Sequence, residues 1–402
     1  MMQKTLGHIK VLELCSLVSG PYCTKLLADL GAEVIKIEHP DAGDSSRHLS
    51  PFLNDIPHPE QSGLFMYLNT NKLGITLDIT TMHGRKIFLD LVKQVDVFVE
   101  DKPPCFMEGL GVQYDRLKEI NPRLVMTSIT PFGQTGPYRD YKAYQLNSFH
   151  AGGEGYMLPI ESTFPQREPL QGGGLCGDCN CGLSAALATL AAVYNVNRTG
   201  QGQHIDVSKQ EVLTTLVGLE VAMYTYTGVI RNRHPRPALM ALPIQCEDGH
   251  IMISAFVDRD WRTFSEFMGN TYWLEDAKFA DMTSRWQNAE EVNEEVEKWA
   301  VHHKKDDLFH YLQNNSVSCS PVNNSEDIVR SAQISNRNFF IEIDHPRTGK
   351  RKYPGVPYKL SDTPVNSGNA APTFGQHNQL IYCEQLGYDP EDLVLFKQNG
   401  VI

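Results

Sequence analysis

The sequence predicts an α/β fold in which helices cover both faces of a parallel sheet. Short apolar runs alternate with longer segments of helical periodicity through the first third of the chain. The segments between these runs are long enough for the helical crossovers that parallel strands require. With 402 residues, of which 41% are hydrophobic, the chain is long enough for two domains.

The first predicted elements are a strand, a helix and a second strand. The strand is Val11-Leu12-Glu13-Leu14. Pro21 is expected to open the helix and Gly31 to end it, because proline favours the first helical turn and glycine the position after the last. The next strand follows at residues 33–37. The pattern continues with strands at residues 75–79, 95–99 and 124–129 and helices at residues 84–92 and 114–120.

A long helix is predicted in the middle of the chain. Leucines recur at helical spacing over residues 182–197, and the glycine-rich stretch 199–202 ends the helix. A strand at residues 204–207 and a single helix at residues 209–227 are expected to follow. The first 227 residues therefore predict the main part of a large parallel-sheet domain.

The pattern changes after residue 227. A β-hairpin is predicted around Asp248-Gly249, and helices at residues 288–303 and 305–312 are short and charged. This combination predicts a smaller α+β domain over residues 228–330.

The charge balance excludes some partners. The 36 Lys and Arg residues face 48 Asp and Glu residues, which gives a net charge of −12. Nucleic acid is therefore not an expected partner, and anionic membrane surfaces are disfavoured. Residues 1–14 lack the apolar core of a signal peptide, and we expect no stretch of bilayer-spanning length. The expected location is the cytoplasm.

Nine cysteines are present, and three of them cluster at Cys176, Cys179 and Cys181. An odd number in a long chain without a secretory segment favours free thiols over a disulfide framework. No second Cys-x-x-Cys or histidine pair completes a tetrahedral site, so we expect no metal.

The densest glycine region is Gly172-Gly173-Gly174-Leu175-Cys176-Gly177, which formally matches the dinucleotide pattern G-x-G-x-x-G. That pattern requires a buried strand directly before it. Residues 165–171 are polar and contain proline, which argues against a nicotinamide or flavin site.

Asp178 follows these glycines at the predicted start of the helix. A carboxylate there favours its ionised form and can attack an activated acyl group. Glycine N–H groups can receive the oxyanion that results. The alternative is a helix cap, a common place for aspartate, and the spacing alone leaves both interpretations open.

Motifs along nearly the whole chain resemble the class III CoA-transferases, also called the CaiB/BaiF superfamily. They are Val11-Leu12-Glu13-Leu14, Ser19-Gly20-Pro21, residues 27–38, Gly43-Asp44, Arg47, Asn71-Lys72, Leu77-Asp78, residues 121–124 and 132–137, Gly177-Asp178, residues 200–203 and Gly400-Val401-Ile402.

The resemblance implies a Rossmann-like large domain built from both chain ends, so that residues 331–402 complete residues 1–227. It also implies two interlocked subunits, as a homodimer or as a heteromer with a related subunit. The expected substrates are an acyl-CoA and a carboxylic acid, with no tightly bound cofactor. Asp178 matches the nucleophile, which forms an anhydride with the acyl group and then a thioester with CoA.

The resemblance also implies CoA contacts. Lys142 and Tyr144 match residues that line the CoA channel, and Leu17, Val18, His39, Lys72, Asp101 and Lys102 fall at other CoA-contacting positions. The lysines suit the CoA phosphates, although each has a solvated surface position as its alternative. Residues 100–105 lack the Asn and Arg that many relatives have there, which suggests rearranged phosphate contacts.

Two other functions stay open. The superfamily includes α-methylacyl-CoA racemases, which need a His and an Asp on opposite sides of the α-carbon. Tyr144 stands where those relatives carry the His, and a phenol with a pKa near about 10 is a poor base. The chain is alternatively a non-catalytic CoA-binding subunit of a heteromeric transferase. Retention of Gly177-Asp178 favours the transferase.

Overall fold

The computed structural model describes residues 4–159, 166–233, 239–240, 242–363, 365 and 368–402. The chain divides into two compact units. The larger unit comprises Met1–Pro159, Arg167–Arg233 and Asn338–Ile402, and the smaller unit comprises Ile160–Gln166 and His234–Arg337.

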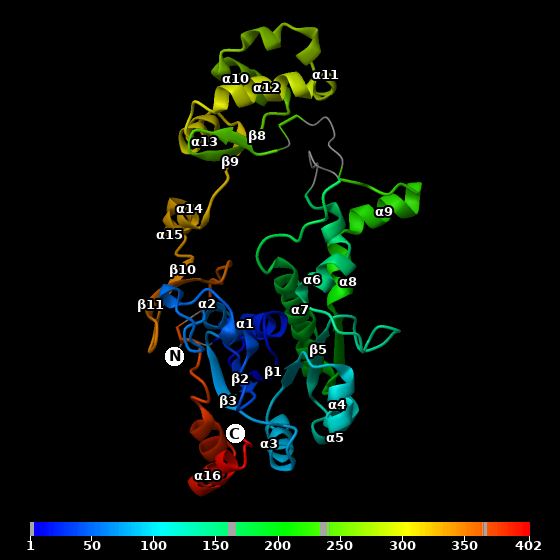
Figure 1. Cartoon of the computed structure of the whole chain (residues 1–402), viewed down its shortest axis with the longest axis vertical. Coiled ribbons are helices and arrows are strands. Elements are labelled where there is room, and N and C mark those ends of the chain that lie inside the picture. Colours follow the sequence, from blue (N-terminus) through cyan, green and yellow to red (C-terminus); the bar gives the residue numbers. More distant parts are fainter. Residues whose placement is uncertain (1–3, 160–165, 234–238, 241, 364, 366–367) are drawn as a thin grey trace. The chain divides into compact units, whose positions relative to one another are not determined.

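A six-stranded parallel sheet forms the centre of the larger unit, which confirms the predicted α/β fold (Figure 1). Its strands are β1 Lys10–Leu14, β2 Glu33–Glu38, β3 Lys72–Thr76, β4 Val97–Glu100, β5 Val125–Thr130 and β6 His204–Ser208. They lie in the order β3-β2-β1-β4-β5-β6. The order reverses between β1 and β4, and such a reversal opens a crevice at the carboxyl ends of the strands.

Successive strand residues face opposite sides of the sheet, and each side has its own apolar core. Val11 belongs to the core that includes α1 and α7. Leu12 belongs to the core that includes α3, α5 and the C-terminal residues Ile381 and Val401. The described helices of this unit include α1 Ser19–Asp29, α2 Gly63–Leu68, α3 Met82–Val92, α4 Pro104–Leu110, α5 Tyr114–Ile120, α6 Gln145–Ala151, α7 Cys176–Thr199, α8 Lys209–Leu216, α9 Gly218–Thr227 and α16 Pro390–Gln398.

Several predicted helix boundaries were wrong. The helix expected to open at Pro21 already begins at Ser19. The helix expected from residue 182 begins at Cys176. The single helix expected over residues 209–227 is two helices, because the backbone leaves helical geometry at Val217 (φ −103°, ψ 28°).

The long helix α7 also corrects an expectation about length. It has 24 residues and is apolar enough, by length and composition, to cross a membrane. One side of it carries buried residues of the core shared with α1, including Ala185 and Ala192. This is how a core helix packs.

The smaller unit contains an antiparallel sheet of β7 Ile244–Cys246, β8 Gly249–Ser254 and β9 Ser318–Pro321. Gly249 already pairs with Cys246, so the hairpin turn lies one residue earlier than predicted. Trp261 and Trp273 stack in its core with ring centroids 4.9 Å apart. Its described helices include α10 Asp258–Met268, α11 Met282–Gln287, α12 Ala289–Ala300, α13 Lys305–Asn314, α14 Ser325–Arg330 and α15 Ala332–Asn336.

A buried ion network joins the strands at the centre of the large sheet. Lys36 on β2 is fully buried, and its ammonium lies 2.8 Å from Glu13 Oε1 and 2.7 Å from Asp44 Oδ2. The second oxygen of Glu13 lies 2.9 Å from the Lys72 ammonium. Burial alone would lower the pKa of Lys36, but the two carboxylates raise it. Buried charges of this kind are tolerated only when each has its partner.

Lys36→Met is expected to destabilise the protein by about 3–5 kcal/mol, because it leaves Asp44 buried without its cation. The free energy of unfolding measured in urea tests this.

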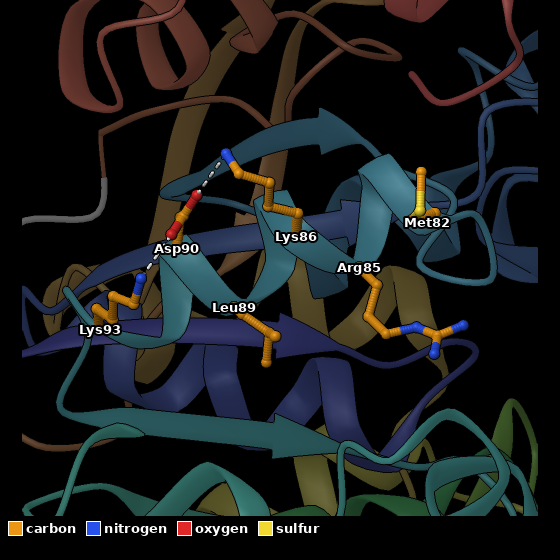
Figure 2. Close-up of a pocket in the computed structure, with 6 residues that line it drawn as sticks. All are labelled: Met82, Arg85, Lys86, Leu89, Asp90 and Lys93. Atoms are coloured by element: carbon orange, nitrogen blue, oxygen red, sulfur yellow. Dashed lines mark hydrogen bonds and ion pairs between the residues drawn. The ribbon is translucent and has the colours of Figure 1, made fainter. Parts of the chain in front are cut away.

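Lys93→Met is the matched control. Lys93 pairs with Asp90 on the outer side of α3, where Figure 2 shows Asp90 between Lys86 and Lys93 beside a surface hollow. An exposed pair of this kind contributes less than about 1 kcal/mol. Equal losses in the two variants would contradict the importance of the buried pair.

Candidate active site

Two carboxylates hold the loop that follows β1. The Ser16 N–H donates to Oδ2 of Asp101, which follows β4, at 2.7 Å. The Leu17 N–H donates to Oδ1 of Asp44, in the segment after β2, at 3.0 Å. Leu17 adopts a φ of 65°, a left-handed conformation that costs a leucine about 1–2 kcal/mol. Loops from three strands therefore fix one another at the carboxyl edge of the sheet.

The loop ends at Ser19, the first residue of α1, and Ser19 contacts Asp178. The Ser19 hydroxyl donates to Oδ1 of Asp178 at 2.8 Å. The Lys209 ammonium lies 3.0 Å from the same oxygen, and Lys209 opens α8 directly after β6. Asp178 is 7% exposed, and Oδ2 accepts no hydrogen bond from the described residues. Two donors hold one oxygen, and the other stays available.

Asp178 lies in the first turn of α7 but does not cap it. The N-cap residue is Leu175, and no side chain caps the first turn. A Cβ on Gly177 would stand 3.3 Å from Leu213 on α8 and 3.4 Å from Phe149 on α6. Glycine before Asp178 therefore lets the first turn of α7 approach both helices, and α8 carries Lys209.

The three clustered cysteines differ in environment. Cys176 is exposed, Cys179 is half-buried and Cys181 is buried, and all three thiols are free. Burial raises the pKa of Cys179 to about 11 and that of Cys181 to about 12. Among the described residues no group of three or more His, Cys, Asp and Glu could hold a metal ion.

A pocket of about 110 Å³ opens at the sheet edge near the β1 loop. Its lining includes His39 after β2, Lys102 after β4 and Asp78 after β3. Burial opposes the charge of Lys102, but Asp101 at 3.0 Å raises its pKa. Two of the predicted CoA contacts therefore share one pocket.

The other residues predicted to contact CoA lie at different positions in the larger unit. Leu17 and Val18 form the loop between β1 and α1, and Asp101 holds that loop through Ser16. Lys142 is exposed, and Tyr144 precedes α6 with 74% of its surface exposed.

Lys72 lies in the core of the sheet. Its ammonium contacts Glu13 at 2.9 Å, and it donates to Pro21 O at 2.8 Å and to Asn69 Oδ1 at 2.9 Å. Burial lowers its pKa to about 8, although Glu13 opposes the shift. These three contacts leave no donor of this ammonium for a phosphate.

The sequence did not single out Ser19 and Lys209 as partners of Asp178. Both directly follow a predicted strand or its loop, so the rule that ligands collect beyond strand ends could have selected them. Ser19 lies 159 residues from Asp178 along the chain, and Lys209 lies 31 residues from it. Only the sheet order brings them together.

Glu100 ends β4 beside this edge and is buried. Its Oε2 accepts a hydrogen bond from the Lys102 N–H at 2.6 Å. Burial raises the pKa of Glu100 from 4.5 to about 7, with a hydrogen bond from Ser128 opposing the shift. The Ser128 hydroxyl also lies 2.8 Å from His204 Nε2. Glu100 therefore titrates near neutral pH inside the sheet.

A family model described as CoA-transferase family III matches residues 6–378. The formyl-CoA:oxalate CoA-transferase of Streptomyces avermitilis is 32% identical over 421 aligned residues, which cover 100% of both chains. The succinyl-CoA–D-citramalate CoA-transferase of Chloroflexus aurantiacus is 30% identical over 403, covering 99% of this chain and 98% of that one. A crystal structure of a CaiB/BaiF family protein from Brucella suis has a TM-score of 0.84 and 28% identity, covering 95% of this chain and 100% of that one.

Glu100→Gln is expected to remove a pH dependence of stability. Because the folded-state pKa of Glu100 is raised, its contribution is fully present below pH 4.5 and is lost as pH rises through about 7. Relative to the variant, the free energy of unfolding of the native chain should fall by about 3 kcal/mol across this interval. Urea unfolding at several pH values measures it.

The exposed Glu119 provides the control, since Glu119→Gln should leave the pH profile unchanged. Parallel profiles for the native chain and Glu100→Gln would disprove the neutral-range titration.

Proposed function

The chain belongs to CoA-transferase family III, and we propose that it moves CoA from an acyl-CoA donor to a free carboxylic acid with Asp178 as the carrier. The supporting observation is the arrangement of the Asp178 carboxylate. It is nearly buried, Ser19 and Lys209 hold Oδ1, and Oδ2 carries no hydrogen bond from the described residues. An oriented carboxylate of this kind is suited to attack a thioester carbonyl.

The reaction proceeds in four exchanges. Asp178 attacks the acyl-CoA, which forms a mixed anhydride and releases the CoA thiolate. The thiolate attacks the aspartyl carbonyl, which gives an aspartyl-CoA thioester and releases the donor acid. The acceptor carboxylate attacks this thioester, forming a second anhydride and freeing the thiolate again. The thiolate finally attacks the acceptor carbonyl, giving the new acyl-CoA and restoring the Asp178 carboxylate.

Ser19 and Lys209 serve these steps from one position. Once Oδ2 has reacted, Oδ1 becomes the carbonyl oxygen of the aspartyl anhydride or thioester. The Ser19 hydroxyl and the Lys209 ammonium already contact this oxygen at 2.8 Å and 3.0 Å. They can therefore stabilise the negative charge that develops there when the thiolate or the acceptor attacks.

CoA itself is assigned to the sheet-edge pocket and the neighbouring loop. His39 and Lys102 line the pocket beside Leu17 and Val18, with Asp101 holding the loop in place. The exposed Lys142 and Tyr144 match family positions along the remainder of the CoA channel. Phosphate groups at a strand-end crevice agree with the general rule for open parallel sheets.

The racemase alternative needs a histidine base opposite the aspartate. Tyr144 occupies the matching position. His150, the nearest histidine in sequence, packs over Gly155, where an added Cβ would clash with its Nδ1. We therefore favour transfer over racemisation, and the partly buried Asp178–Lys209 pair favours catalysis over a purely binding role.

Two subunits are proposed to associate through α9. No residue of this helix is buried in the single chain. Leu219 and Tyr226 are 67% and 91% exposed. An apolar helix left uncovered on a folded unit is typical of an interaction surface, and a second copy of the chain is the proposed partner.

Asp178→Ala is expected to lower CoA transfer by at least about 10³-fold, because it removes the group that carries the acyl and CoA moieties. In the native enzyme, hydroxylamine added during turnover should convert Asp178 to a hydroxamate detectable by peptide mass. The surface variant Asp90→Ala should keep full activity. Transfer by Asp178→Ala at the native rate would eliminate the mechanism, and solvent deuterium uptake at an α-carbon would favour racemisation.

Tyr226→Glu is expected to weaken self-association, because it places a charge on the proposed apolar interface. Sedimentation velocity should show a shift from dimer to monomer at micromolar concentration. Met82→Glu, on the 78% exposed Met82 of α3, is the matched control. A native chain that sediments as a monomer would rule out the dimer.

A further inference from the structure

Two of the clustered cysteines lie on either side of Asp178 at the start of α7, in the sequence Cys176-Gly177-Asp178-Cys179. Cys176 is the first residue of the helix. Side chains three residues apart share one face of a helix, with Cβ atoms about 5–6 Å apart. A disulfide holds its Cβ atoms about 3.5–4.5 Å apart, so a small tightening of this turn would join the two sulfurs. A Cys-x-x-Cys pair in an α/β fold is typical of a redox-active dithiol.

The first thiol of the pair is open to reagents. Cys176 is exposed, and its Sγ donates to the Gly173 carbonyl at 3.4 Å. An added Cβ on Gly173 or Gly174 would meet no atom within 4 Å, so open space borders the segment that precedes Cys176. A small molecule can therefore reach this sulfur from solvent.

The second thiol of the pair is less accessible and lies near the first. Cys179 is half-buried. Burial raises its pKa to about 11, and the charges of Asp178 and of a Cys176 thiolate add to the shift. Disulfide exchange begins at an accessible sulfur, and a second thiol then resolves the mixed disulfide. This difference in access makes Cys176 the attacking sulfur and Cys179 the resolving one.

We propose that Cys176 and Cys179 form a reversible disulfide by exchange with the disulfide of a small thiol, and that Cys176 is modified first. The Cys176 thiolate attacks one sulfur of the small disulfide, which forms a mixed disulfide and releases one small thiolate. The Cys179 thiolate then attacks Sγ of Cys176 and releases the second small thiolate. The two protein thiols are oxidised and give up their protons, and the small disulfide is reduced to two thiols.

The disulfide changes the surroundings of Asp178. Cys176 loses the thiol proton that it donates to the Gly173 carbonyl, so the glycine segment before α7 loses this contact. The turn that carries Asp178 tightens, whereas Ser19 and Lys209 belong to α1 and α8 and do not move with it. Their contacts to Oδ1 are therefore disturbed, and CoA transfer slows. This effect on the rate rests on the proposed transferase function, and the disulfide exchange does not.

The test incubates the native chain with oxidised glutathione, blocks the remaining free thiols and maps the cysteines by peptide mass. The peptide that contains Cys176 and Cys179 should lose two hydrogens. Cys179→Ser should instead accumulate a mixed disulfide with glutathione at Cys176. CoA transfer by the native chain should fall by about 10-fold or more on oxidation, because the carboxylate is displaced, and should return with dithiothreitol. Transfer by Cys176→Ser should be insensitive to oxidised glutathione.

Cys105→Ser is the matched control, because Cys105 is exposed on α4 and has no second cysteine three residues away. It should respond to oxidised glutathione as the native chain does. A mixed disulfide that persists at Cys176 in the native chain would reject the redox pair. A disulfide that leaves the rate of transfer unchanged would reject its effect on Asp178.

The same measurements separate this proposal from the proposed function. Formation of the Cys176–Cys179 disulfide in a chain that transfers CoA to no acid would reject the transferase proposal and retain the redox pair. Transfer without any disulfide in this turn would retain the transferase and reject the pair. Thermal melts of each variant identify any loss of activity that reflects unfolding.

Discussion

The rest of the site depends on the ion pairs that the buried ammonium of Lys36 forms. This ammonium ties Glu13 on β1 to Asp44 after β2. The other oxygen of Asp44 holds the Leu17 N–H, which keeps the β1 loop in its left-handed conformation. That loop sets the position of Ser19 and so the hydrogen bond to Asp178. An ion pair in the core thus fixes a carboxylate at the sheet edge.

The network extends beyond one pair, and its extent explains why buried charge is acceptable here. Arg47 makes two hydrogen bonds to Glu38, at 2.7 Å and 2.8 Å, and Glu38 also accepts from the Asp44 N–H. Because each charge has a partner, the cost of removing the charges from water is offset. The network then fixes the relative positions of the groups that it joins. A reaction that depends on the placement of one carboxylate oxygen benefits from such rigidity.

The fold could be predicted where it depends on local sequence patterns. The site could not be predicted where it depends on contacts between residues distant in the sequence. The positions of the strands follow from the apolar runs, and their parallel direction follows from the lengths of the crossovers. The strand expected at residues 75–79 ends at Thr76, and Leu77 and Ile79 are buried in the connection that follows. The prediction was wrong here because apolar residues indicate burial and do not by themselves indicate strand pairing. Asp178 stood out through its glycines. Ser19 and Lys209, which contact its Oδ1, did not stand out, because the order of the strands in the sheet brings both to that oxygen.

The ion pair at Asp178 also shapes the proposed reaction through its charge. While Asp178 is a carboxylate, the Lys209 ammonium is balanced. When Asp178 is acylated it loses its charge, and an unbalanced cation then stands beside the reacting carbonyl, in a site where water screens it little. The next reactant, whether thiolate or carboxylate, is an anion in both cases. The covalent intermediate therefore attracts the anions that resolve it, and the last exchange restores the Asp178 carboxylate and its charge balance with Lys209.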